Sequence, residues 1–108
     1  MKKLFVIIAL TFSSMYVNGQ TLSAEDRQTM RLAEQDGYVI CNCKANEILI
    51  KPTLWKNLPY ASKRNLGEMY AIKCAGERKS NLRYIKILDY YSGKEIAKYS
   101  ESWGFKIH

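Results

Sequence analysis

The chain has 108 residues, of which 47% are hydrophobic and 25% charged, and its formal net charge at pH 7 is +7. This length is enough for one small domain and excludes a multidomain protein. The sequence contains no internal repeat, linker or low-complexity tract. The excess of basic residues favours an anionic partner over a cationic one.

The first 19 residues have the three regions of a secretory signal peptide. Lys2 and Lys3 form a positive start, the apolar run 4–12 follows, and residues 13–19 are more polar, with small residues near the end. The apolar run is well short of the roughly 20 residues that a membrane-spanning helix needs. We therefore predict cleavage between Gly19 and Gln20, export to the periplasm or medium, and no membrane span after cleavage. The alternative is a buried N-terminal strand.

The first half of the remaining chain, residues 20–108, alternates between helical and extended patterns. Ser23, followed three residues later by Asp26, predicts a capped helix that ends near Asp36, with Gly37 as its stop. The β-forming residues 38–43 and 47–51 predict two strands on either side of a turn. A short helical turn is expected at 53–59.

The second half predicts a longer helix followed by a hairpin. We expect this helix to be capped by Ser62 and to end at Gly76, with apolar residues at helical spacing between them. Strands are expected at 82–88 and 95–99, joined by a turn that begins at Asp89 and contains Gly93. Residues 103–107 could add a short last strand. The fold class is therefore α+β: a small antiparallel sheet of three to five strands with two helices packed on one face, in a single domain spanning 20–108.

Three cysteines, Cys41, Cys43 and Cys74, are the chemically richest group in the sequence. In an exported protein the first expectation for cysteine is a disulfide. Cys41 and Cys43 are two residues apart on one predicted strand, which places their Cα atoms about 6.5–7 Å apart, at the outer limit for a disulfide. We expect Cys43 to pair with Cys74, with Cys41–Cys74 as the alternative. The remaining thiol is most simply a small buried apolar side chain.

Other uses of the cysteines define the alternative function, a small thiol- or metal-handling protein. The three cysteines, with His108 as a fourth ligand, could bind zinc or copper(I). The spacing differs from that of structural zinc sites, however, and His108 is the last residue. No metal or other cofactor is therefore the first expectation.

Catalytic motifs are missing from the sequence. His108 is the single histidine, so a catalytic triad would need a C-terminal base, and there is no nucleophile elbow, phosphate-binding glycine loop or zinc-protease motif. Carboxylates such as Asp89 are more simply explained as turn residues than as catalytic acids or bases. We expect a protein that is not an enzyme.

Basic and aromatic residues are interleaved in the second half of the chain. We expect a binding surface on the hairpin and the Trp103 segment, formed by Lys86, Lys94, Lys98, Tyr91 and Trp103. The partner would be a protein or an anionic envelope component, and export argues against intracellular nucleic acid. The alternative is a mixed surface whose lysines protect strand edges from aggregation. The protein itself is expected to be a monomer or weak dimer.

One layout in the chain has a counterpart in other proteins. It consists of Trp55 and Leu58, then Tyr70, then the segments 89–94 and 97–99. This layout resembles that of short bacterial exported proteins of unassigned function, over about half of the chain that remains after cleavage. The resemblance implies a bacterial source and no catalytic residue.

Overall fold

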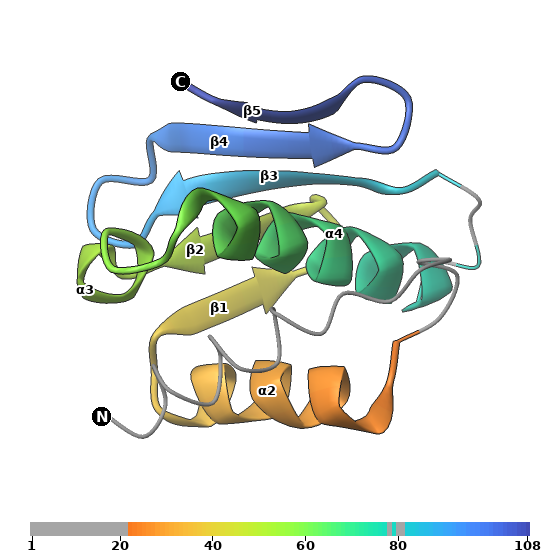
Figure 1. Cartoon of the computed structure of the whole chain (residues 1–108), viewed down its shortest axis with the longest axis horizontal. Helices are drawn as coiled ribbons and strands as arrows, with labels where there is room; N and C mark the ends of the chain where they lie inside the picture. The colour runs from red at the N-terminus through yellow and green to blue at the C-terminus, as the bar shows by residue number, and fades with distance from the viewer. Residues whose placement is uncertain (1–21, 78, 80–81) are drawn as a thin grey trace.

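The computed structural model describes residues 22–77, 79 and 82–108 as three helices and a five-stranded sheet (Figure 1). The elements in chain order are α2 (Ala24–Gln35), β1 (Val39–Asn42), β2 (Glu47–Ile50), α3 (Pro52–Trp55), α4 (Tyr60–Glu77), β3 (Tyr84–Asp89), β4 (Glu95–Ser100) and β5 (Gly104–Ile107). The predicted α+β class is confirmed. The predicted signal peptide, 1–19, lies outside the described residues.

The strands lie in the sheet in the same order as in the sequence, β1-β2-β3-β4-β5. Three neighbouring pairs are antiparallel, but β2 and β3 are parallel, so the sheet is mixed where the sequence predicted an antiparallel one. The physical reason lies in the connection. The chain leaves β2 through α3 and α4, and a helical crossover returns it to the starting end of the sheet, so β3 runs in the same direction as β2.

Helix α2 begins and ends as its sequence predicts. Ser23 is the N-cap: its hydroxyl accepts a hydrogen bond from the Asp26 backbone N–H at 3.0 Å, and the Asp26 carboxylate accepts one from the Ser23 N–H at 3.3 Å. This reciprocal capping box satisfies two amides that the helix itself leaves without partners. Gly37 follows with φ of 78°, a conformation that glycine adopts without steric cost.

Helix α4 is longer than predicted at both ends. It begins at Tyr60, directly after Pro59, so Ser62 lies inside the first turn and is not the cap; it also continues through Gly76 to Glu77. At its middle, Gly67 approaches β4 so closely that a Cβ atom there would lie 3.2 Å from Tyr99 Cβ. The missing side chain therefore lets the helix pack directly on the sheet.

The two faces of the sheet differ in their covering. Ile48, Ile50, Ile85, Ile87 and Ala97 point to the face that carries α4 and are completely buried. α4 lies across this face and α2 lies beside the β1 edge (Figure 1). Because successive side chains of a strand point to opposite faces, the residues between these five point to the other face, which no described helix covers.

The described residues contain no helix with the length and apolar character needed to cross a membrane.

Candidate functional site

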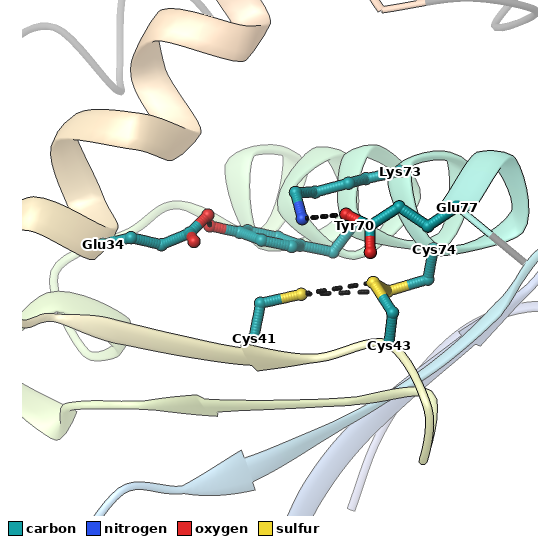
Figure 2. Close-up of a disulfide and its surroundings, with 7 residues drawn as sticks. All are labelled: Glu34, Cys41, Cys43, Tyr70, Lys73, Cys74 and Glu77. Carbon is teal, nitrogen blue, oxygen red and sulfur yellow. Dashed lines mark hydrogen bonds and ion pairs between the residues drawn. A yellow bond between two sulfur atoms is a disulfide. The ribbon is translucent and has the colours of Figure 1, made fainter.

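Three sulfur atoms meet between β1 and α4 (Figure 2). Cys43 and Cys74 form a disulfide with a Cα–Cα distance of 4.9 Å, which is the first of the two pairings that the sequence leaves open. Cys41 is a free thiol. Its Sγ lies 3.6 Å from Cys43 Sγ and 3.8 Å from Cys74 Sγ. The cluster therefore combines a disulfide and a thiol in contact with both of its sulfurs.

Strand geometry and one helix turn bring the cysteines together. Cys41 lies in β1 opposite Ile48, a buried residue of β2, so its side chain points toward the helix layer. Cys43 is two residues further and points to the same side. Cys74 lies in the last part of α4, where it is completely buried. The disulfide thus joins the covering helix to the end of an edge strand.

Two features lower the reactivity of the Cys41 thiol toward the disulfide. Burial raises its pKa from 9.0 to about 11, although the nearby Lys73 ammonium acts in the opposite direction. The thiol is therefore protonated at neutral pH, whereas the thiolate is the nucleophile in disulfide exchange. Its sulfur is also almost equidistant from the two bonded sulfurs, so it lies beside the disulfide and not along the extension of the S–S bond. Exchange would need both ionisation and a change of rotamer.

Polar residues of both helices border the cluster. The Tyr70 hydroxyl donates a hydrogen bond to Glu34 Oε2 at 3.0 Å, which connects α4 to α2 (Figure 2). Burial, together with the Glu34 carboxylate, raises the pKa of Tyr70 well above its usual value. Lys73 and Glu77 form an ion pair of 2.7 Å one turn apart on α4. These contacts hold one cation and two carboxylates near the sulfurs.

His108 is not near the cysteines. It follows β5 and pairs with Glu95 of β4, whereas Cys41 lies in β1 at the opposite edge of the sheet. Four strand spacings of about 4.8 Å separate these edges. The possibility of His108 as a fourth metal ligand is therefore wrong, because the strand order places it across the whole sheet.

The uncovered face of the sheet carries a row of lysines. Lys86 pairs across the strands with Lys98, and Lys98 pairs with Lys106, so three lysines stand side by side on β3, β4 and β5. On the other side of Lys86 the register places Glu47, whose carboxylate lies 3.3 Å from the Lys86 ammonium. We call Lys86, Lys98 and Lys106 the lysine row.

Aromatic residues lie along one side of the lysine row, toward the β4–β5 turn. Trp103, which is 41% exposed, lies under two of its ammonium groups: Lys98 Nζ is 5.0 Å from the indole ring and Lys106 Nζ is 5.3 Å from it. Tyr84 packs edge-on against the same indole, with ring centroids 6.3 Å apart. These cation–π contacts hold the flexible lysine side chains against an aromatic platform.

Two of the predicted binding residues lie elsewhere. Tyr91, which is 71% exposed, and Lys94 belong to the β3–β4 turn. In that turn Asp89 accepts hydrogen bonds from the Tyr91 and Ser92 amides, at 3.1 and 2.8 Å. Lys94 precedes Lys98 by four residues, which corresponds to about 13 Å along an extended strand. The structure therefore brings together Lys86, Lys98 and Trp103.

Sequence reasoning left three neighbours out of the binding set: Lys106, Tyr84 and Glu47. Residue alternation alone could place Tyr84 and Lys86 on one face of β3. The cross-strand alignment with Lys106 and Glu47 depends on register and on the parallel β2–β3 pair. Lys106 and Glu47 could therefore not be assigned to this surface without knowledge of the sheet.

An open groove of about 1100 Å³ also lies between α2 and the end of α4. Its lining mixes apolar residues with charges of both signs, Arg27, Arg31 and Lys73 among the basic ones and Glu34 and Glu77 among the acidic ones. Because Lys73 and Glu77 already pair with each other, the groove has no clear preference for a ligand charge.

Comparison with known proteins does not assign a family: no family model, no curated protein and no solved structure matches this chain.

Proposed function

We propose that this protein is an exported binding protein that contacts an acidic protein surface through the uncovered face of its sheet. The observation that carries the proposal is the lysine row, Lys86, Lys98 and Lys106, aligned across three adjacent strands. A carboxylate-bearing partner laid on this face would meet three ammonium groups in one line, of which the Lys86 group also contacts Glu47.

The alignment of like charges in the lysine row should destabilise the sheet, and the need for a soluble surface does not explain why they are aligned. Like charges directly opposite each other in a sheet destabilise the pair. Lysine on an edge strand protects against aggregation, and this accounts for Lys106 on β5. Lys86 and Lys98 lie on interior strands, where no edge needs protection. An acidic partner would remove the repulsion and supplies the missing reason for their alignment.

The surroundings of the row favour a protein over a simple polyanion. Ile40, Leu49 and Leu88 are aligned on the same face on one side of the row, and Ile40 is 47% exposed. Tyr84 and Trp103 lie on the other side. Apolar and aromatic side chains around a charged centre match the mixed character of protein interfaces. A polysulfated glycan would use the charges alone.

Binding without catalysis, in an oxidising compartment, is part of the same proposal. The Cys43–Cys74 disulfide is compatible with an exported location, since disulfides persist mainly outside the cytosol. The free thiol beside it is half-buried, and burial raises its pKa, so it is protonated at neutral pH. The one histidine is engaged with Glu95 at the far edge.

Polyglutamate is a suitable probe of this surface, and its binding can be followed by NMR titration and by calorimetry at two salt concentrations. We expect shifts at the lysine row and Trp103, and weaker binding at higher salt because the contacts are ionic. The double variant Lys98→Glu/Lys106→Glu should weaken binding about tenfold, since exposed ion pairs contribute about 0.2–1 kcal/mol each and reversal adds repulsion.

The matched control is Arg27→Glu/Arg31→Glu, which changes the net charge equally on exposed positions of α2. It should retain nearly all of the binding. Equal losses in the two variants would mean that net charge alone matters, and would overturn the proposal. So would binding to heparin with none to polyglutamate, because that result would assign the face to a glycan.

A further inference from the structure

The third sulfur of the cysteine cluster is not explained by the disulfide. A disulfide needs two cysteines, and helix and sheet are already joined by Cys43 and Cys74. Cys41 nevertheless points its thiol at both of them from the neighbouring position of the same strand face (Figure 2). An ordinary buried thiol would need only apolar neighbours, whereas this one is in contact with two other potential sulfur ligands.

Two of the three sulfur–sulfur distances match those of a metal–thiolate centre. With metal–sulfur bonds of about 2.3 Å, ligand sulfurs lie about 4.0 Å apart in a trigonal site and about 3.8 Å apart in a tetrahedral one. Cys41 Sγ is already 3.6 and 3.8 Å from the other two. Only the Cys43 and Cys74 sulfurs would have to separate, and all three ligand atoms lie within 4.8 Å of one another.

We propose that, once the Cys43–Cys74 disulfide is reduced, Cys41, Cys43 and Cys74 form a three-thiolate site for copper(I). Among the described residues, the group of closely spaced potential ligands consists of these three cysteines alone. Structural zinc sites almost always have four protein ligands, whereas copper(I) is a soft ion that thiolates select. The chemistry of the donor set therefore points to copper(I). The site is separate from the lysine row, on the opposite face of the sheet.

The redox and proton balance of the site is simple. A dithiol reductant supplies two electrons and two protons, which convert the disulfide into two thiols while the reductant becomes a disulfide. The three thiols then bind one copper(I) ion and release three protons, leaving a centre with a charge of −2. Oxidation of Cys43 and Cys74 removes two of the three ligands. Copper binding and the disulfide thus exclude each other, and the site responds to the thiol redox state.

The local charges both help and oppose such a centre. Lys73 lies close enough to Cys41 to favour its thiolate, whereas Glu34 and Glu77 act against it. Because Lys73 is paired with Glu77, reorientation of this one ion pair toward the cluster would place the ammonium near the new negative charge. A variant that removes the lysine is therefore a useful second probe.

The test uses the purified protein, reduced and kept under nitrogen, in competition with a chromophoric copper(I) chelator, and native mass spectrometry gives the stoichiometry. We expect one copper(I) per chain, no binding by the oxidised protein, and at least tenfold weaker binding by Cys41→Ser. Cys41→Ser keeps both cysteines of the disulfide, so its oxidised form serves as the folding control. Lys73→Met should weaken binding less than Cys41→Ser does.

Near-UV circular dichroism of the copper-bound protein separates a folded site from binding by an unfolded chain. A native-like spectrum with bound copper supports the proposal. Equal copper affinity in Cys41→Ser and the parent protein would overturn it, as would binding that leaves the chain unfolded. Tight binding of zinc with none of copper(I) would also overturn the assignment.

Discussion

Removal of Cys74 is the most informative perturbation of the disulfide, because this residue is the common partner in both possible pairings. The disulfide spans a sequence separation of 31 residues. In the chain-entropy model, a loop of this length contributes about 3.7 kcal/mol to the free energy of unfolding at 25 °C. Small domains have about 5–15 kcal/mol in total. Cys74→Ala should therefore lose about 3.7 kcal/mol, a large part of the stability.

Cys43→Ala should behave differently. In this variant Cys41 Sγ, which lies 3.8 Å from Cys74 Sγ, can take the place of the missing sulfur. The new loop has a separation of 33 residues, so its entropic contribution differs from that of the native loop by less than about 0.1 kcal/mol. Cys43→Ala should thus retain most of the stability, whereas Cys41→Ala/Cys43→Ala should lose about as much as Cys74→Ala.

Urea denaturation gives the free energies of unfolding, and iodoacetamide labelling in denaturant, followed by mass spectrometry, counts the free thiols. We expect no free thiol in Cys43→Ala, one in the double variant, and a Cys41–Cys74 peptide in the digest of Cys43→Ala. Cys41→Ala alone is the control and should keep the native disulfide. Two free thiols in Cys43→Ala, with a stability equal to that of the double variant, would refute this reasoning.

Two further predictions concern the packing of α4 and the Cys41 thiol. Gly76→Ala should raise the free energy of unfolding by about 0.5–1 kcal/mol, because its Cβ meets nothing within 4 Å in a helix. Gly67→Ala gains the same helix propensity but places a Cβ 3.2 Å from Tyr99 Cβ, and overpacking costs about 1–3 kcal/mol. It should therefore be less stable than Gly76→Ala in urea denaturation, and equal stabilities would contradict the close approach. For Cys41, burial raises the pKa from 9.0 to about 11. Its iodoacetamide reaction rate should therefore keep rising above pH 10, and stability should fall as the pH rises through 9 to 11, because the unfolded chain loses this proton first. A rate that levels off near pH 9 would contradict the effect of burial.

Local features of this protein could be predicted from its sequence because they depend on neighbouring residues. The Ser23–Asp26 capping box, the Asp89 turn and the alternation of apolar residues in β3 involve contacts within a few positions of the chain. The extra length of α4 was missed for a related reason. A helix can begin directly after a proline without Ser62 as its cap, and it can pass through Gly76 when packing of its buried face outweighs the low helix propensity of glycine.

The candidate sites could be predicted only in part, because their assembly depends on strand order and register. The residue types could be read from the sequence: three cysteines, an excess of basic residues, and aromatic residues interleaved with them in the second half of the chain. Strand register aligns Lys86, Lys98 and Lys106 in one row, and the packing of α4 on the sheet brings Cys41 into contact with both sulfurs of the Cys43–Cys74 disulfide. Strand order places His108 at the far edge of the sheet. The physical reason is that strand pairing depends on contacts between residues far apart in the sequence. The crossover through α4 makes β2 and β3 parallel neighbours, for example, and this places Glu47 beside Lys86 and Leu49 beside Leu88.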